Sequence, residues 1–219
     1  VVVLAALINS LNIVNKEIKN IKIVIVGSGS AGYGIAKLLH YSGCRNIVVF
    51  DSKGPIHKGR KKHMNKYKKE IAKFTNAKEN GPLSKVIINS DVFIGVSGIK
   101  NLLKISMVKK MGINSIVFAL TNPEPEIVPS VAKKAGVKII ATGSFKYHNK
   151  VNNAIVFPYL MRVILDLKIK RITMEILYNT AQAIANTVNK NKLSVNNIIP
   201  ELGDKKIYSN IVKSFSATS

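Results

Sequence analysis

The chain has 219 residues, of which 47% are hydrophobic, so it can bury the core of one large domain or of one and a half small ones. Aromatic residues make up only 6% and Trp is absent, so we expect a core of Ile, Val, Leu and Ala. No stretch has the length and freedom from charge of a membrane span, so we expect no membrane-spanning segment and no membrane partner. A single cysteine, Cys44, excludes an internal disulfide and fits a reducing, cytoplasmic compartment.

The formal charge of +23 comes from 34 Lys and Arg residues against 11 Asp and Glu residues. A nucleic-acid-binding protein on an α/β scaffold is one explanation, and it predicts tight binding with a steep salt dependence. We favour a general compositional bias, because the lysines are spread along the chain among many Asn and Ile residues. We therefore expect no nucleic-acid partner, and we interpret the densest run, residues 57–69 (HKGRKKHMNKYKK), as a solvated loop and helix face.

Residues 1–18 form the first expected element. Apolar residues recur there at helical spacing, at Leu4, Leu7, Ile8, Leu11 and Val14, so we expect a helix that packs on the sheet. The sequence has no initiator Met, and the helical pattern starts without an N-cap residue. We interpret the chain as the C-terminal part of a longer protein.

Residues 22–51 carry the most informative pattern, KIVIVGSGSAGYGIAKLLHYSGCRNIVVFD. A β-branched strand ends at Gly27, and Gly29 and Gly32 complete a G-x-G-x-x-G motif with a helical pattern behind it. A second apolar strand then ends in Asp51. This arrangement of strand, glycine turn, helix, strand and acid is typical of a dinucleotide-binding unit. The alternative is a glycine-rich turn of another doubly wound protein, with Asp51 as an ordinary strand-end acid.

Each part of the motif has a physical role. Gly27 permits the tight turn, Gly29 lets a pyrophosphate approach the backbone, and Gly32 lets the helix pack closely on the strand. The helix N-terminus offers unpaired N–H groups to the phosphates, and Asp51 is placed to accept hydrogen bonds from the adenosine ribose. The turn residues that we expect to contact the cofactor are Gly27, Ser28, Gly29, Ser30, Ala31 and Gly32.

Further strands and helices alternate after Asp51. We expect a loop at residues 52–55, strands at residues 91–96, 115–120 and 137–141, and helices at residues 65–74, 83–88, 106–111 and 127–135. The alternation predicts an α/β fold with a Rossmann-type, doubly wound and mostly parallel sheet. Ligands bind at the carboxyl ends of such strands, so Ser97, Gly98 and Asn122 are candidate contacts.

The strand pattern stops near residue 152, and helical patterns follow at residues 152–165 and 174–188 and at the end of the chain. We expect a nucleotide-binding domain at residues 1–166 and a helical extension at residues 167–219 that packs on it. The histidines (40, 57, 63 and 148) have no clustered partners at metal-ligand spacing, so we assign neither metal ligands nor catalytic residues to this chain.

Several runs together resemble the NAD-binding and C-terminal part of prokaryotic-type malic enzymes, over residues 1 to about 204. The runs are VGSGSAGYGIAKLL, FDSKGPIHKGR, DVFIGVS, IVFALTNPEPEI and ATGSFKYHNKVNNAIVFP. The resemblance implies oxidation of (S)-malate with NAD or NADP and decarboxylation to pyruvate and CO2, with Mg or Mn. It also implies that the acid–base Tyr and Lys and the metal-binding acids lie upstream, so this chain alone should bind nucleotide without turning over malate.

The resemblance suggests roles for particular residues. Asp51 would bind the adenosine ribose, Ser97 and Gly98 would line the cofactor path, and Asn122 would contact the nicotinamide or the malate carboxylate. Asn152 or Asn153 would reach the substrate and the nicotinamide, although Asn is also a frequent helix N-cap.

Cofactor choice and assembly follow from the same resemblance. The carboxylate of Asp51 favours NAD over NADP, while Lys53 and Lys58 nearby oppose that preference. The family implies a homo-oligomer, usually a dimer.

The segment Ser144 to Lys150 departs from the family pattern, and Tyr159 and Val163 replace its glycines. A non-catalytic nucleotide-binding remnant or regulatory module is therefore the alternative function.

Overall fold

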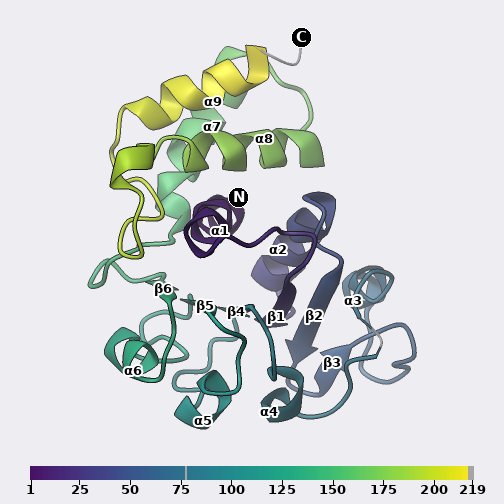
Figure 1. Ribbon diagram of the computed structural model, residues 1–219. Helices are drawn as coiled ribbons and strands as arrows, with labels where there is room; N and C mark the ends of the chain where they lie inside the picture. The colour runs from purple at the N-terminus through teal and green to yellow at the C-terminus, as the bar shows by residue number, and fades with distance from the viewer. Residues whose placement is uncertain (77, 217–219) are drawn as a thin grey trace.

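A computed structural model describes residues 1–76 and 78–216 of the chain. Residue 77 and residues 217–219, the last three of the expected helical extension, lie outside the described residues. The fold is built on a six-stranded sheet in the order β3-β2-β1-β4-β5-β6 (Figure 1). The strands are β1 (Lys22–Val26), β2 (Asn46–Asp51), β3 (Gly54–Ile56), β4 (Val92–Gly95), β5 (Ile116–Ala119) and β6 (Ile139–Thr142).

The central strands are buried on both faces, as their β-branched sequences require. Alternate residues point to opposite sides. Ile23 and Ile25 of β1 lie in one hydrophobic core, whereas Val24 and Val26 lie in the other. The pairs β1–β2, β1–β4, β4–β5 and β5–β6 are all parallel, so the expected doubly wound, mostly parallel sheet is confirmed.

Helices cover both faces of the sheet. The first core lies beneath α1 (Val2–Val14) and α2 (Ser30–Tyr41), and α7 (Phe157–Asp166), α8 (Met174–Ala185) and α9 (Lys206–Ser216) add further residues to it. The second core lies beneath α4 (Leu83–Val86), α5 (Ile105–Val108) and α6 (Pro129–Lys134). The remaining helical elements are α3 (Lys66–Ile71), η1 (Asn153–Ile155) and η2 (Lys190–Lys192).

The first helix is held between the parallel sheet and the C-terminal helices. Figure 1 shows α7, α8 and α9 gathered on the side of α1 away from the strands. The buried side chain of Asn9 donates hydrogen bonds of 3.0 Å to the carbonyl oxygens of Ala185 and Ile198. These bonds join the start of the chain to its last fifty residues.

The sequence reading was wrong at residues 52–55, where it expected only a loop. Gly54 to Ile56 form β3, an edge strand that pairs antiparallel with β2, with Pro55 opposite Phe50. Proline has no N–H to donate to a neighbouring strand, so within sheets it is found at edges such as this one. For the same reason Pro55 gave no indication of a strand in the sequence. Among the residues that the structure describes, none of the helices combines the length and the apolar character that crossing a membrane requires.

Candidate functional site

The turn between β1 and α2 is tightly packed on its inner side. Gly27 has φ +116, and a Cβ placed on it would lie 2.4 Å from the carbonyl oxygen of Val96. A Cβ on Gly32 would lie 1.8 Å from the carbonyl oxygen of Gly27. The turn thus fits between β1, β4 and the first turn of α2 only because these two positions carry no side chain.

The outer side of the same turn is open. Gly29 is the N-cap residue of α2, has no side-chain capping bond, and a Cβ on it would meet nothing within 4 Å. Ser30 and Ala31 follow in the exposed first turn. Their N–H groups and the positive end of the helix dipole face this space, which is the arrangement that holds a phosphate. The residues present therefore fit the pyrophosphate of a dinucleotide.

A pocket of about 350 Å³ extends from this turn along the carboxyl edge of the sheet. It brings together residues that are far apart in the sequence, since Ser30 and Ala31 line it with Asn122, Asn152 and Asn153. Its other lining residues are Val1, Val2, Val3, Gly34, Ile35, Val96, Leu120, Gly143 and Val151. Three of the expected cofactor contacts, Ser30, Ala31 and Asn122, thus share one cavity with the expected substrate contacts Asn152 and Asn153.

Two of the amides, those of Asn122 and Asn152, lie against the backbone of Gly143. A Cβ on Gly143 would lie 2.7 Å from Nδ2 of Asn122, so glycine makes room for that side chain. Asn152 donates from Nδ2 to the carbonyl oxygen of Gly143 at 3.0 Å, and its Oδ1 accepts from the N–H of Ala154 at 3.0 Å. Asn152 is therefore both a cap of η1 and a lining residue of the pocket, so the two interpretations of this residue are compatible.

Ser97 and Gly98 do not line the pocket, but they directly follow its lining residue Val96 after the end of β4. They are organised by a buried acid that the sequence reading did not single out. The carboxylate of Glu126, with no exposed surface, accepts from the N–H of Thr121 at 3.2 Å and from the N–H of Ser97 at 3.4 Å. The hydroxyl of Thr121 donates to Glu126 and accepts from the N–H of Gly98 at 3.0 Å. The one available signal was weak, because Glu126 is the second acid of the run Glu124-Pro125-Glu126 and only the following Ile127 and Val128 indicate burial.

Gly95 completes this arrangement. A Cβ on it would lie 2.3 Å from the carboxyl carbon of Glu126, so the strand end is open there to admit the acid. Glu126 thereby connects the loop after β4, which carries Ser97, to the loop after β5, which carries Asn122.

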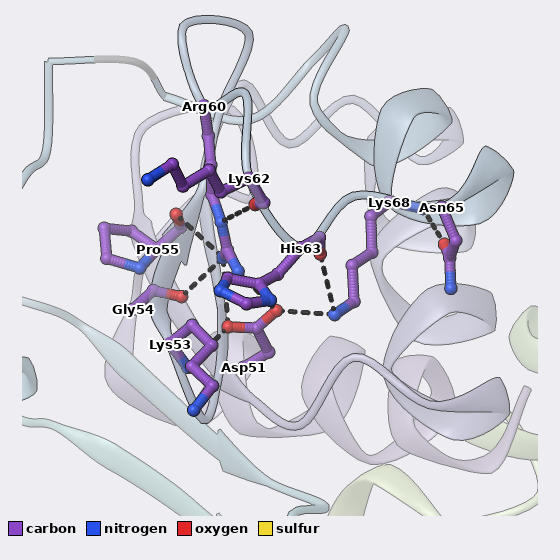
Figure 2. A network of polar contacts seen from close by, with 9 residues as sticks. All are labelled: Asp51, Lys53, Gly54, Pro55, Arg60, Lys62, His63, Asn65 and Lys68. Atoms are coloured by element: carbon purple, nitrogen blue, oxygen red, sulfur yellow. Dashed lines mark hydrogen bonds and ion pairs between the residues drawn. The ribbon is translucent and has the colours of Figure 1, made fainter.

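Asp51 lies outside this pocket, at the carboxyl end of β2, and its side chain is only 9% exposed. Arg60 binds both carboxylate oxygens, at 3.0 and 2.9 Å, and Nζ of Lys68 lies 2.6 Å from Oδ2 (Figure 2). Burial alone would raise the pKa of Asp51, but the hydrogen bonds from Arg60 and Lys68 outweigh it and lower the pKa to about 2. The carboxylate is therefore ionised at neutral pH.

This cluster corrects the interpretation of residues 57–69 as a solvated face. Many of these side chains are exposed, but Arg60 and Lys68 are only 10% and 20% exposed. The carboxylate of Asp51 draws these two cations inward, whereas nothing local in the run distinguishes them from their neighbours.

The described part of the chain brings no three His, Cys, Asp or Glu residues together in a way that could hold a metal ion. Of the two positions where the family pattern has glycine, Val163 is fully buried in α7 and Tyr159 packs against the first core. Both side chains are therefore accommodated as part of the helix packing.

Comparison with known proteins agrees with this geometry. Residues 1–214 match the family described as malic enzyme, NAD binding domain. The chain is 42% identical to the bifunctional malic/malolactic enzyme of Bacillus subtilis over 97% of its own length and 52% of that protein. It is 41% identical to the NADP-dependent malic enzyme of Salmonella typhimurium, over 83% of its own length and 24% of that protein.

Solved structures show the same relationship. The crystal structure of NAD-dependent malic enzyme from Thermotoga maritima superimposes with a TM-score of 0.91 at 38% identity, covering 97% of this chain and 56% of that one. The chain therefore spans about half the length, or less, of the relatives that it matches. The glycine turn, the parallel sheet and the amide-lined pocket are thus those of a Rossmann-type domain that belongs to the malic enzyme family.

Proposed function

We propose that this chain is the NAD(P)-binding part of a malic enzyme, which oxidises (S)-malate and decarboxylates it to pyruvate and CO2. The observation that carries the proposal is the pocket that the N-terminal residues of α2 line together with Asn122 and Asn152. In this proposal residues 1–166 form the nucleotide-binding domain and residues 167–219 form a helical extension of it.

Different residues of the pocket bind the pyrophosphate and the nicotinamide end of the nucleotide. The N–H groups around Gly29 and Ser30 bind the pyrophosphate, since no side chain blocks them. Asn122, Asn152 and Asn153 orient the nicotinamide and the malate, because amides offer donors and acceptors without adding charge that would oppose hydride transfer. When bound, NAD(P)⁺ supplies the hydride acceptor.

In this proposal, acid–base catalysis and metal binding belong to a further part of the protein, which this chain does not include. The chain spans 52% of the Bacillus subtilis relative and 56% of the Thermotoga maritima structure. We expect the acid–base residues and the ligands of the Mg or Mn ion to come from the half that these 219 residues do not match. The whole protein would then turn over malate, whereas this part would bind the nucleotide.

Nucleotide binding is tested by titrating the protein, as its native gene encodes it, with NADH and NADPH and following nucleotide fluorescence. The variant Gly29→Val places a side chain in the open space, at a φ of −72 that any residue adopts, so it should fold and lose binding. Ser130→Val places the same final side chain in the exposed first turn of α6, away from the pocket, and should leave binding unchanged. Failure of the parent protein to bind either nucleotide would overturn the proposal.

Turnover is tested on the same protein with malate, NAD(P)⁺ and Mg²⁺, measuring pyruvate and reduced nucleotide together. Equal amounts of both products are expected, with loss of activity in Gly29→Val. Binding of nucleotide without any malate-dependent reduction would favour the non-catalytic alternative.

A further inference from the structure

The two loops beside the pocket enclose a buried carboxyl group. The loop after β4 carries Ser97, and the loop after β5 carries Asn122, which lines the pocket. Glu126 belongs to the second of these loops and has no exposed surface. In the described part of the chain, no Lys, Arg or His forms an ion pair with it. Burying a carboxyl group in this way costs free energy unless hydrogen-bond donors surround it.

Among the described residues, every partner of this carboxyl group is a donor from one of the two loops. Oε1 of Glu126 accepts from the N–H and the hydroxyl of Ser97, both at 3.4 Å, and from the hydroxyl of Thr121. Oε2 accepts from the N–H of Thr121 at 3.2 Å. The hydroxyl of Ser97 itself accepts from the N–H of Ile99 at 3.2 Å. The hydroxyl of Thr121 accepts from the N–H of Gly98 at 3.0 Å. Both hydroxyl groups thus have their protons available for Glu126, and this position calls for a side chain with two acceptor oxygens.

The two loops are also joined by their backbones, but later in the loop after β4. The N–H of Asn101 donates to the carbonyl oxygen of Pro125 at 3.2 Å. The N–H of Leu103 donates to the carbonyl oxygen of Glu126 at 2.9 Å. Nearer the sheet, the loops are connected through the carboxyl group of Glu126 and the hydroxyl of Thr121. The side chain of Glu126 therefore fixes the ends of the loops that lie next to the pocket.

Asn122 directly follows Thr121, so the position of its backbone depends on these bonds. Thr121 bonds to Glu126 through both its N–H and its hydroxyl. The side chain of Asn122 lines the pocket and lies against Gly143. Glu126 is not a lining residue, so its effect on a bound molecule passes through the loops. The proposed pyrophosphate site belongs to a different element, the N-terminal turn of α2.

We infer that Glu126 is a positioning residue for the nicotinamide end of the nucleotide. It holds the loops after β4 and β5 together at the strand ends and so fixes Asn122 where it contacts the nicotinamide or the malate. The inference rests on the proposed function, because it concerns the same pocket. Without the carboxyl group, α2 still binds the pyrophosphate, but the nicotinamide is held less rigidly. A misplacement of reacting groups by about 1 Å lowers a rate by up to about 100-fold, so catalysis suffers more than affinity.

The test measures three quantities on the protein as its native gene encodes it. They are the dissociation constant of the reduced nucleotide, NADH or NADPH, that binds more tightly, the fluorescence lifetime of that nucleotide when bound, and kcat with malate, NAD(P)⁺ and Mg²⁺. The variant Glu126→Gln keeps the size of the side chain but replaces one acceptor oxygen by an NH2 group, which faces donors at either position. Its dissociation constant should stay within about threefold of the parent value, while the lifetime shortens toward that of the free nucleotide and kcat falls about tenfold or more.

Glu124→Gln is the matched control. Glu124 lies two residues earlier in the same loop, is exposed, and pairs with Lys100 of the loop after β4 at 3.0 Å. The same substitution there removes a carboxylate that bridges the same two loops at the surface, and it should change each of the three quantities less than about twofold. Glu126→Asp keeps two acceptor oxygens on a shorter side chain and should recover part of the lifetime and of kcat.

The thermal transition of each variant reports whether it is folded. If Glu126→Gln does not fold, Thr121→Val takes its place, because it removes the hydroxyl that connects Glu126 to Gly98 and should shorten the lifetime in the same way. A folded variant with the lifetime and kcat of the parent would overturn the inference, and so would an equal loss in Glu124→Gln or a loss of affinity as large as the loss of kcat. All of these outcomes leave the proposed function in place. Absence of binding of both nucleotides to the parent protein would instead overturn the proposed function, and this inference with it.

Discussion

The substitution Gly27→Ala tests whether the nucleotide turn depends on the absence of a side chain for two separate reasons. The backbone of Gly27 has φ +116, a conformation that costs a non-glycine residue about 1–3 kcal/mol. The new Cβ would also lie 2.4 Å from the carbonyl oxygen of Val96 and 2.6 Å from its carbonyl carbon. Both are backbone atoms of the neighbouring strand end, so relief requires the strands to move.

The overlap adds about 1–3 kcal/mol, the usual cost of forcing extra atoms into a packed region. Gly136→Ala supplies the matched comparison, because Gly136 has φ +103 and a Cβ there would meet nothing within 4 Å. Both variants share the conformational cost and the loss of glycine entropy in the unfolded chain, so their difference isolates the overlap.

The assay is equilibrium unfolding in denaturant, supported by thermal unfolding. Gly27→Ala should lose about 2–6 kcal/mol of unfolding free energy, and Gly136→Ala about half of that. The transition temperature should fall about 2–4 °C for each kcal/mol in a chain of this size. Equal stability of the two variants would refute the reasoning, because it would mean that the turn relaxes away from Val96 without cost.

Three further predictions concern buried groups elsewhere in the chain. Asn9→Ala leaves two buried carbonyl oxygens without their donor and should lower the unfolding free energy by about 2–4 kcal/mol, whereas Asn12→Ala on the exposed side of α1 should change it by less than about 0.5 kcal/mol. The pKa of Asp51 is lowered from 3.8 to about 2 in the folded protein. The ionised carboxylate therefore contributes about 2 kcal/mol to the free energy of unfolding above pH 3.8, and this contribution is lost as the pH falls toward 2. The stability advantage of the parent protein over Asp51→Asn, followed by denaturant unfolding at each pH, should narrow over that interval; a constant gap would contradict the assignment. Cys44 is fully buried and burial raises its pKa to about 11, so a thiol reagent should modify it only at the rate of unfolding, and rapid modification of the native protein would show that the site is open.

The elements that the sequence predicted well are those specified by neighbouring residues. The glycine spacing fixes the turn at Gly27 and Gly32, and the runs of Ile and Val fix β1, β2, β4 and β5. Even the position of Asn122 at a strand end follows from the local alternation of strand and helix. The pocket was therefore predictable in its parts, since parallel strands bring their carboxyl ends to one edge.

The features that could not be predicted depend on contacts that form when the chain folds back onto an earlier strand. β3 exists because three residues turn back onto β2, and its Gly and Pro gave no strand signal. The same reversal carries Arg60 onto Asp51, nine residues earlier, and α3 then brings in Lys68. Among so many lysines, charge alone could not identify the one that is held inward.

Buried polar residues were missed for a related reason. Asn9 stands in an apolar stretch and its two partners lie 176 and 189 residues later, so only the folded chain brings them close. Glu126 bonds to Thr121 in its own loop, but its bond to Ser97 joins residues 29 apart in the sequence. Glu126 in particular positions Ser97, a residue that sequence reasoning had assigned to the site without knowing what holds it.

The position of α1 has a consequence for the synthesis of the chain. Its hydrogen bonds through Asn9 reach partners 176 and 189 residues later, so α1 leaves the ribosome long before α8 does. At about 5–20 residues per second, this largely apolar helix waits roughly 10–40 s for the surface that covers it. A nascent chain arrested before residue 174 should therefore keep α1 accessible to proteases and chaperones, and completing α8 should protect it.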